Sequence, residues 1–407
     1  METPNPAFVT ITQPTVPPES ARPGVLGPLG PAQLTCLRSW RKLGLQPLFV
    51  HLTPGNGTPG WPGTPGHHLP IPRDALRTSA GQTRLRDFLT ANRCAGLTCL
   101  GEGDARLLRA IEPELPCPLW LPSQRSLDFL DAKSRQAELA RACGFAVLPT
   151  WHADRDHLPL IPAGAFPVVA RPDGSGSAEP MFKIKILHTP AALTTWLGSF
   201  RKLDRPVLLQ PFIDGPNLVI HAATDANGTP FALAAFLVRR KFEGVTLTLE
   251  PAPLDPSLRA ACTAFCQGAG LHGCLHFELL LDPRDATPWF LEVNGRLGGT
   301  TGKVHLLGFD EPRLLLSAHG VLPYPPAAGT PQDGVVCNRL ALTKLLLAMA
   351  RQDPDLAHDP SGLPRTWRDL LTGFLLWRDE IFRRDDPRVT LWYLRDWLAD
   401  RLDRSHR

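Results

Sequence analysis

Eight consecutive residues, Phe290-Leu291-Glu292-Val293-Asn294-Gly295-Arg296-Leu297, carry the strongest signal in this chain of 407 residues. They place a carboxylate, a carboxamide and a guanidinium at alternate positions of an otherwise apolar segment. Alternate residues of a β-strand point to the same face, so Glu292, Asn294 and Arg296 are predicted to share one side. Polar groups gathered in this way indicate a binding site.

A second strand is predicted just upstream, where Leu275-His276-Phe277-Glu278-Leu279-Leu280-Leu281 also alternates. Residues 282–287 are typical of a turn, so a hairpin would bring Glu278 beside Glu292 and Asn294. Two carboxylates and an amide oxygen form a set of hard ligands that suits Mg²⁺. The alternative is a surface hairpin with solvated acids on one face.

A second polar segment follows the β-branched strand predicted at residues 166–171, which ends in Arg171. The loop after this strand, Asp173-Gly174-Ser175-Gly176-Ser177, is rich in glycine and serine. Such a loop can bring its backbone N–H groups close to phosphate oxygens, because glycine allows close approach and unusual dihedral angles. Residues 182–187 are the predicted returning strand, and a plain hairpin loop is the alternative interpretation.

A third segment indicates a hinge. The apolar strand predicted at residues 207–213 stops at a Pro/Gly bend, and a new strand is predicted at residues 218–223. A short irregular linker between two strands is typical of a junction between lobes. Its free backbone groups, together with Phe212, could hold a flat base.

Length and composition set the outer limits. At about 100–200 residues per domain, the chain corresponds to two or three domains. Its 43% hydrophobic and 20% charged residues are those of an ordinary soluble protein, and a net charge of +4 gives no indication of a nucleic-acid or membrane partner. Residues 1–22 contain no apolar leader segment, and no apolar run reaches the roughly 18 residues of a membrane helix. We therefore expect a cytoplasmic protein, whose nine cysteines are free thiols because they lack metal-ligand spacing.

The order of predicted elements indicates three regions. Strands and helices alternate through residues 1–122, which predicts a Rossmann-like α/β domain with a parallel sheet. Its Gly24-Val25-Leu26-Gly27-Pro28-Leu29-Gly30 segment does not fit a dinucleotide fingerprint, and Pro28 removes a phosphate-binding amide. Residues 123–330 carry the polar segments described above. Residues 331–407 are predicted to be a helical extension with tryptophans as packing anchors, and a partner surface or dimer contact is the alternative.

Taken in order, these segments resemble the ATP-grasp superfamily over roughly residues 120–320. The strand-end cation, the Gly/Ser loop, the hinge strand, the carboxylate strand and the E-x-N-x-R motif all occur in the family's sequence. Asp131-Ala132-Lys133, early in a helix predicted to run to Ala142, looks like the family's D-K pair. The resemblance implies two α+β lobes that grip ATP, preceded by the α/β domain. Within the superfamily the chain is most similar to the carboxylate–amine ligases.

The resemblance also assigns roles to residues. It implies ATP and Mg²⁺ as cofactors, with one or two ions and Mn²⁺ as an alternative metal. The implied nucleotide-binding residues, four of which form a mobile lid, are Lys133, Arg171, Gly174, Ser175, Gly176, Ser177, Gln210, Phe212, Ile213 and Asn217. The implied metal ligands are Glu278, Glu292 and Asn294, and the implied catalytic residue, facing the transferred phosphate, is Arg296.

Three positions depart from the family pattern. Arg171 stands where lysine is usual, and its bulkier, forked guanidinium is not a neutral exchange. Gln210 and Asn217 stand where acids are frequent, which affects the implied adenine and ribose contacts.

The activity implied by the resemblance is an ATP- and Mg²⁺-dependent carboxylate–amine or peptide ligase that acts through an acyl phosphate and releases ADP and phosphate. Its expected partners are a small carboxylate and a small amine, and a homodimer is one expected assembly. Phosphoryl transfer needs positioning and charge neutralisation more than a protein nucleophile, which agrees with the residues found here. A small-molecule kinase on the same fold and a non-catalytic ATP-binding sensor module stay open as alternatives.

The acceptor side of the site is predicted at Gly298-Gly299-Thr300-Thr301-Gly302-Lys303-Val304-His305. Its glycines allow close approach to a bound carboxylate, to which Thr300, Thr301 and Lys303 could donate. A Gly-rich turn before a helix near residues 312–319 is the alternative interpretation.

Overall fold

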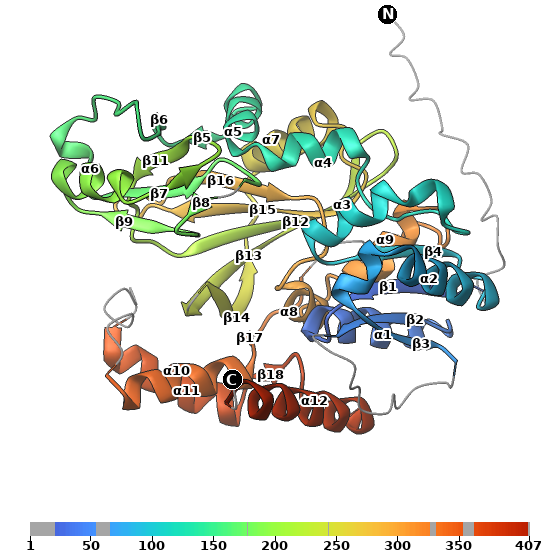
Figure 1. Ribbon diagram of the computed structural model, residues 1–407. Helices are drawn as coiled ribbons and strands as arrows, with labels where there is room; N and C mark the ends of the chain where they lie inside the picture. Colours follow the sequence, from blue (N-terminus) through green and yellow to red (C-terminus); the bar gives the residue numbers. More distant parts are fainter. Residues whose placement is uncertain are drawn as a thin grey trace, which may run out of the picture.

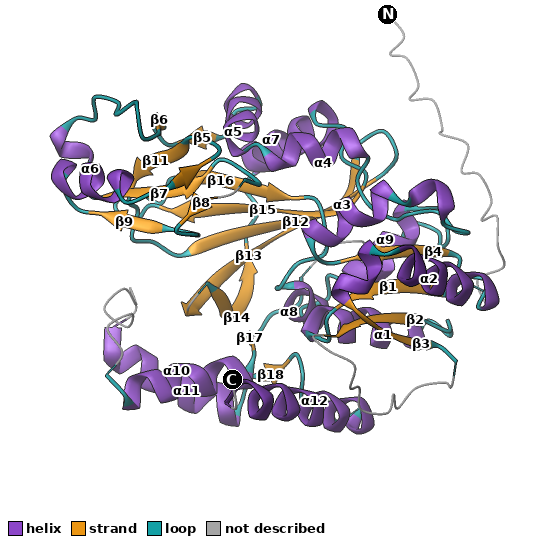
Figure 2. Ribbon diagram, viewed as in Figure 1, coloured by secondary structure: helices purple, strands orange, loops and turns teal. Residues whose placement is uncertain are grey.

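The computed structural model describes residues 21–53, 66–176, 178–242, 244–325, 331–352 and 362–405. Ser177, one of the implied lid residues, lies outside the described residues. Figures 1 and 2 show the N-terminal α/β region, a large sheet with a smaller sheet above it, and the C-terminal helices.

The N-terminal region contains the predicted parallel sheet. Its strands lie in the order β3-β2-β1-β4, and every pairing between them is parallel. Proline opens α1 and basic residues end it, as expected from the free N–H groups and the dipole of a helix. The elements are β1 (Pro23–Gly27), α1 (Pro31–Lys42), β2 (Leu48–Thr53), β3 (His68–Pro72), η2 (Arg73–Arg77), α2 (Ser79–Ala91), β4 (Gly96–Cys99), α3 (Glu102–Ala110) and η3 (Glu112–Glu114).

The centre of the molecule is an eight-stranded sheet with the order β18-β17-β14-β13-β12-β15-β16-β5. The hairpin predicted from the carboxylate-bearing segments is β15–β16 in this sheet, and its strands pair antiparallel as expected. The strands are β5 (Ala146–Val147), β12 (Asn217–Thr224), β13 (Pro230–Phe242), β14 (Val245–Ala252), β15 (Gly273–Leu281), β16 (Pro288–Asn294), β17 (Val336–Cys337) and β18 (Arg378–Asp379).

One face of this sheet is covered by α4 (Gln124–Asp131), α5 (Lys133–Ala142) and α7 (Pro256–Gly268). The core between them contains Phe265 and Phe277, both fully buried. The sequence predicts a single helix through this region, and that prediction is wrong, because Ala132 adopts an extended conformation. Asp131 therefore ends α4 and Lys133 begins α5, which leaves the groups of this junction free to contact a loop of the smaller sheet.

The opposite face packs against α8 (Thr301–Leu306) and α9 (Glu311–Ala318), which lie between the sheet and α1. Trp40 of α1 is fully buried and donates its indole N–H to the carbonyl of Pro312 at 3.0 Å. The N-terminal region is thus attached to the large sheet through the two helices that follow β16.

The smaller sheet has the order β6-β11-β7-β9 and is antiparallel. The returning strand predicted at residues 182–187 is shorter, since only Lys185–Leu187 pairs with β7. Residues 212–216 join β11 to β12 and so connect the two sheets, as the hinge prediction requires. Strands β8 (Ala178–Glu179) and β10 (Lys202–Leu203) of the same region form a separate two-stranded sheet. The other elements of the region are β6 (Trp151–Ala153), η4 (Ala163–Ala165), β7 (Val168–Pro172), β9 (Lys185–Leu187), α6 (Pro190–Gly198) and β11 (Val207–Pro211).

The C-terminal region contains α10 (Arg339–Ala350), α11 (Gly362–Leu375) and α12 (Pro387–Ser405). The region is mainly helical, as predicted, but the helix expected at residues 370–382 ends at Leu375, and the region also supplies β17 and β18 to the large sheet. Buried polar contacts hold it in place: Arg240 of β13 binds Asp369 at 2.9 Å, and Arg38 of α1 donates to the carbonyl of Ile381. The boundaries predicted at residues 122 and 330 stay predictions.

All nine cysteines are free thiols, as predicted. Within the described ranges, no helix is both long and apolar enough to cross a membrane.

Candidate active site

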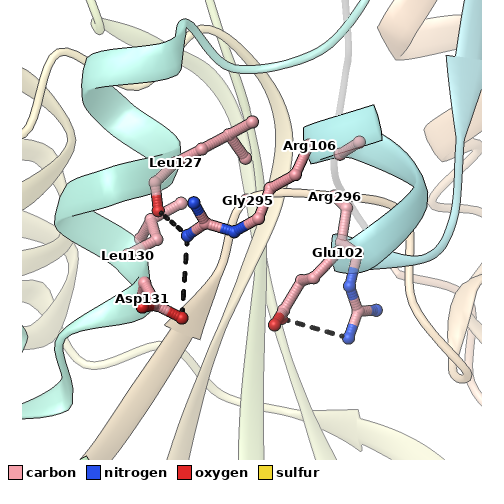
Figure 3. A pocket seen from close by; sticks show the side chains of 8 residues that line it. Glu102, Arg106, Leu127, Leu130, Asp131, Gly295 and Arg296 are labelled. Atoms are coloured by element: carbon pink, nitrogen blue, oxygen red, sulfur yellow. Dashed lines mark hydrogen bonds and ion pairs between the residues drawn. The ribbon is translucent and has the colours of Figure 1, made fainter. Parts of the chain in front are cut away.

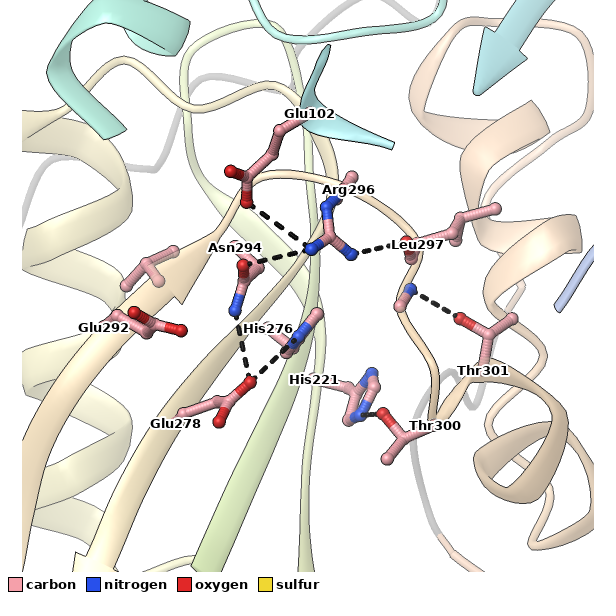
Figure 4. Close-up of polar contacts among 12 residues, drawn as sticks. Glu102, His221, His276, Glu278, Glu292, Asn294, Arg296, Leu297, Thr300 and Thr301 are labelled. Atoms are coloured by element: carbon pink, nitrogen blue, oxygen red, sulfur yellow. Dashed lines mark hydrogen bonds and ion pairs between the residues drawn. The ribbon is translucent and has the colours of Figure 1, made fainter. Parts of the chain in front are cut away.

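The β15–β16 hairpin sets the arrangement of the site. Glu278 lies opposite Glu292, and His276 lies opposite Asn294, with a register shift after Glu278. Asn294 donates its Nδ2 to Glu278 Oε1 at 3.3 Å, and Arg296 Nη2 donates to Asn294 Oδ1 at 3.4 Å (Figure 4). The structure therefore brings together the two acids, the amide and the guanidinium of the sequence motif.

Two further cations converge on this hairpin from other elements. Lys133 at the start of α5 places its Nζ 3.4 Å from Glu292 Oε2, and Arg171 of β7 places its Nη2 3.8 Å from the same oxygen. Arg171 Nη2 also donates to the carbonyl of Leu291 at 3.2 Å. Gln136 accepts a hydrogen bond from the N–H of Val293 at 2.6 Å, which fixes α5, and with it Lys133, against β16.

The charge state of Glu278 follows from its neighbours. Burial opposes ionisation of this carboxyl group, but the hydrogen bond and charge of His276 and the charges of Lys241 and Arg296 prevail and lower its pKa to about 2. Glu278 is therefore ionised at neutral pH, in the form that a metal ion requires.

The donor set fits Mg²⁺ only with help from the substrate. Among the described residues, no three His, Cys, Asp or Glu side chains gather as a metal-binding group. Mg²⁺ is usually held by one or two carboxylates together with substrate phosphates and water. Glu278, Glu292 and the amide oxygen of Asn294 match that requirement, and the nearby cations suit the phosphates of a nucleotide.

The Gly/Ser loop after β7 is attached to the junction of α4 and α5. The N–H of Ser175 donates to Asp131 Oδ1 at 2.8 Å, and the N–H of Ser134 donates to Asp173 Oδ1 at 2.7 Å. Gly174 has a φ of 143°, and a Cβ at this position would collide with the carbonyl oxygen of Asp131. The implied phosphate loop thus starts beside Lys133.

A small cavity of about 20 Å³ lies between α3, α4 and the segment that follows β16 (Figure 3). In it Arg106 contacts Asp131 at 3.6 Å, and Arg296 contacts Glu102 at 3.4 Å. A space of this size holds a water molecule or so, not a substrate. Its importance is that Glu102, which the sequence prediction missed, holds the guanidinium of Arg296 in this structure.

The residues predicted to contact adenine and ribose have different surroundings: Gln210 and Phe212 make hydrogen bonds within the protein, and Asn217 lines a cavity. Gln210 is buried and donates to Thr150 Oγ1 at 3.0 Å, and the N–H of Phe212 donates to the carbonyl of Pro167 at 2.9 Å. The backbone N–H of Phe212 is therefore already paired within the protein, and the adenine contacts of Gln210 and Phe212 stay predictions. Ile213 lies partly exposed in the hinge, while Asn217 lines a cavity together with Glu278.

That cavity, of about 220 Å³, lies on the face of the large sheet that carries Glu278. Besides Asn217 and Glu278 it is lined by His276, Lys241 and Thr300. The sequence prediction missed His276 and Lys241. His276 carried a usable signal, since it lies two residues before Glu278 and so shares its face. Lys241 carried none, because register shifts between residues 238 and 241 of β13 disturb the alternation.

The predicted acceptor wall is only partly present. Lys303 is buried and pairs with Glu380 at 2.6 Å, and Thr301 is buried and donates to Glu311 at 2.5 Å. These two side chains support the fold, so their prediction as substrate donors is wrong. Gly299 and Thr300 form a turn, as in the alternative interpretation, and the helix expected near residues 312–319 is α9. The turn leads first into α8, which was not predicted, and Thr300 alone of the three predicted donors lines the cavity.

Known structures share this architecture, although no family model and no curated protein matches the sequence. The biotin carboxylase domain of Hydrogenobacter thermophilus 2-oxoglutarate carboxylase, solved as a dimer with MgADP and bicarbonate, has a TM-score of 0.58 and 14% identity over 77% of this chain and 73% of its own. Staphylococcus aureus N5-carboxyaminoimidazole synthetase has a TM-score of 0.56 and 14% sequence identity, over 82% of this chain and 86% of its own. Bacillus licheniformis L-amino acid ligase has a TM-score of 0.53 and 18% sequence identity, over 74% of each chain. These proteins have the ATP-grasp fold, and the likeness shows the same fold for this chain, while the predicted arrangement of its domains stays a prediction.

Proposed function

We propose that this protein is an ATP- and Mg²⁺-dependent ligase that joins a small carboxylate to a small amine through an acyl phosphate and releases ADP and phosphate. The observation that carries the proposal is the convergence of Glu278, Glu292, Asn294 and Arg296 with Lys133 from the start of α5. One structural neighbour is named an L-amino acid ligase, which supports the same class of reaction.

The residues account for the needs of phosphoryl transfer. A carboxylate is a poor electrophile, and transfer of the γ-phosphoryl group of ATP converts it into an acyl phosphate that an amine can attack. The protein has to align the two substrates and neutralise negative charge. Lys133 and Arg171 are proposed to bind the phosphates, since both already contact the carboxylate of Glu292. Arg296 is proposed to stabilise charge on the transferred group.

The bound metal would supply further neutralisation of the phosphate oxygens. Its proposed ligands are Glu278, Glu292 and Asn294, of which Glu278 is kept ionised by its cationic neighbours. The contact between Lys133 and Glu292 holds the carboxylate in place in the structure described here. The amine is itself the nucleophile that attacks the acyl carbon and displaces phosphate, so the site needs no nucleophilic side chain and has to position the amine.

The proposal is tested by ADP release from MgATP across a matrix of amino acids and small carboxylates. Glu292→Ala serves as the blank, and Glu250→Ala, which removes a half-exposed carboxylate of β14 paired with Arg239, is the matched control. Amine-dependent ADP release that is lost in the blank, kept in the control and accompanied by a condensed product in the mass spectrum supports the ligase. A phosphorylated acceptor without condensation would instead establish a kinase.

A further inference from the structure

The cavity beside Glu278 has a composition that selects a ligand. Of the described residues that line it, Lys241 is the one lysine or arginine. Three valines, Val219, Val238 and Val245, supply apolar surface to the same cavity. Lys241, together with this apolar surface, suits a molecule with one carboxylate and an aliphatic part, since His276 already faces Glu278.

Thr300 is held at the edge of this cavity by a fully buried chain of polar groups. Glu311 and His221 each have a side-chain exposure of 0%, and Glu311 Oε1 lies 2.7 Å from His221 Nδ1. His221 Nε2 lies 3.0 Å from Thr300 Oγ1. Glu311 is ionised, because burial raises its pKa less than the charge and hydrogen bond of His221 lower it. The ionised carboxylate accepts a hydrogen bond from the Nδ1–H of His221, and this bond fixes the orientation of the ring whose Nε2 contacts Thr300.

The same carboxylate also organises the backbone of the Gly-rich segment. Glu311 Oε2 accepts the hydroxyl hydrogen of Thr301, and Thr301 Oγ1 accepts the N–H of Gly298 at 3.0 Å. His276 stacks on His221 with ring centroids 5.3 Å apart, and its Nδ1 is a buried atom without a hydrogen-bond partner in the described residues. The other ring nitrogen, Nε2, lies 3.7 Å from Glu278 Oε1, so His276 links the buried chain to the lining of the cavity.

We propose that this cavity is the acid subsite of the ligase and that it takes a small aliphatic monocarboxylate. The inference rests on the proposed function. Lys241 pairs with the carboxylate, Thr300 hydrogen-bonds to it, and the valines contact the aliphatic chain. The carboxylate then lies on the side of the cavity formed by Glu278, where the phosphates of ATP are proposed to bind.

Size and charge set the limits of the substrate class. A volume of about 220 Å³ is below the roughly 300–1,000 Å³ of sites for drug-sized ligands, so the cavity suits a short acid better than a peptide or a bulky aromatic acid. A dicarboxylate would place its second carboxylate against valine side chains or near Glu278. No cation is left to pair with it there, because His276 Nε2 already faces Glu278 Oε1 at 3.7 Å. The subsite therefore distinguishes acids by charge as well as by length.

The test compares butyrate with succinate, two acids with four carbon atoms that differ in one carboxylate, and with phenylacetate as the bulky acid. Hydroxylamine replaces the unidentified amine. The acid's oxygen attacks the γ-phosphorus while the bond to ADP breaks, hydroxylamine nitrogen then attacks the acyl carbon and phosphate leaves, and the hydroxamate is measured together with ADP. Saturation-transfer NMR measures binding of each acid separately, with and without MgADP.

We expect butyrate to be used at least tenfold better than succinate or phenylacetate, and Lys241→Met to raise the KM for butyrate about 10- to 100-fold while the KM for ATP is unchanged. Lys344→Met, which removes an exposed lysine of α10, is the matched control and should leave both constants unchanged. Thr300→Val should raise the KM for butyrate by a larger factor than it lowers kcat, and Thr300→Ser should restore the wild-type KM. A purely structural role of Thr300 would predict neither result.

The two measurements separate the two hypotheses. Binding of butyrate that requires Lys241, without any ADP or hydroxamate, supports the subsite and overturns the proposed ligase. ADP and hydroxamate formed from succinate or phenylacetate in preference to butyrate support the ligase and overturn the subsite. Failure of butyrate to bind both with and without MgADP also overturns the subsite.

Discussion

Lys303 allows a direct test of whether the segment after β16 binds substrate through its lysine or uses it to support the fold. The Nζ of Lys303 lies 2.6 Å from Glu380 Oε1, and both side chains are 1% exposed. Asn338 donates to the same oxygen at 2.6 Å, while Glu380 Oε2 has no partner in the described part of the chain. Lys303→Met therefore leaves a buried carboxylate with one hydrogen bond and no counter-charge.

The expected loss of stability follows from that geometry. Removal of one partner of a buried ion pair costs roughly 3–5 kcal/mol, because the remaining charge stays desolvated. Burial already raises the pKa of Glu380 despite the opposing charge of Lys303, and the pKa rises further when the lysine is removed. Because folding raises the pKa of Glu380, ionisation of this carboxyl group lowers the free energy of unfolding at high pH. This loss of stability becomes smaller as the pH falls and the group is protonated.

Urea unfolding of the wild type and Lys303→Met, followed by tryptophan fluorescence at about pH 8 and about pH 5, measures this loss. The double variant Lys303→Met/Glu380→Gln is the matched control. It removes both charges but keeps an acceptor for Asn338, so most of the stability should return. Lys303→Met with unchanged stability and a KM for the acid raised tenfold or more would refute the structural role and restore Lys303 as a substrate donor.

Three further predictions concern other parts of the molecule. The pKa of His51 is lowered to about 4 by burial first and by the charge of His68 second, so its contribution to stability is present above about pH 6.5 and lost as the pH falls toward 4. Thermal unfolding of the wild type against His51→Gln should show a difference in acid sensitivity of about 2 kcal/mol between pH 7 and pH 5, and parallel pH profiles would contradict this. In Gly298→Ala the new Cβ would lie 2.5 Å from the His276 ring, and we expect a loss of about 1–3 kcal/mol in urea unfolding that Gly299→Ala, with open space around its Cβ, does not show. Glu292→Gln should lower MgATP turnover about 100-fold or more with little change in circular dichroism, and near wild-type turnover would exclude Glu292 as a metal ligand.

Local sequence was sufficient for the central hairpin. Alternation places Glu278, Glu292 and Asn294 on one face, and the turn between the strands allows only a narrow range of registers. The periodicity of the N-terminal residues likewise predicts the parallel sheet, because strands separated by helices pair in this way. These signals are local. A shift of one residue in strand register would move every apolar side chain to the other face of the sheet, so the sequence pattern itself excludes it.

Local sequence was misleading where distant segments compete for the same groups. The helix predicted through Ala132 breaks because Asp131 and Ser134 bind the Gly/Ser loop some 40 residues further along the chain. Helix propensity depends on local sequence and therefore does not include such contacts, each of which replaces a local hydrogen bond by one to a distant residue. The error lies at the proposed nucleotide site, where conflicts between local and tertiary preference are common.

The sequence by itself determined the strand that bears the proposed metal ligands, the fold class and the chemical character of the site, because these depend on side-chain types at fixed spacing. Tertiary structure alone decided which polar residues face the cavity and which are used to hold the molecule together. Lys303 and Thr300 lie three residues apart on one segment, yet one is paired with Glu380 of the C-terminal region and the other lines the cavity beside Lys241. The partners of Lys303, Thr300 and Lys241 come from elements far away in the chain, and only packing of the sheet against α8 and α9 brings them within reach.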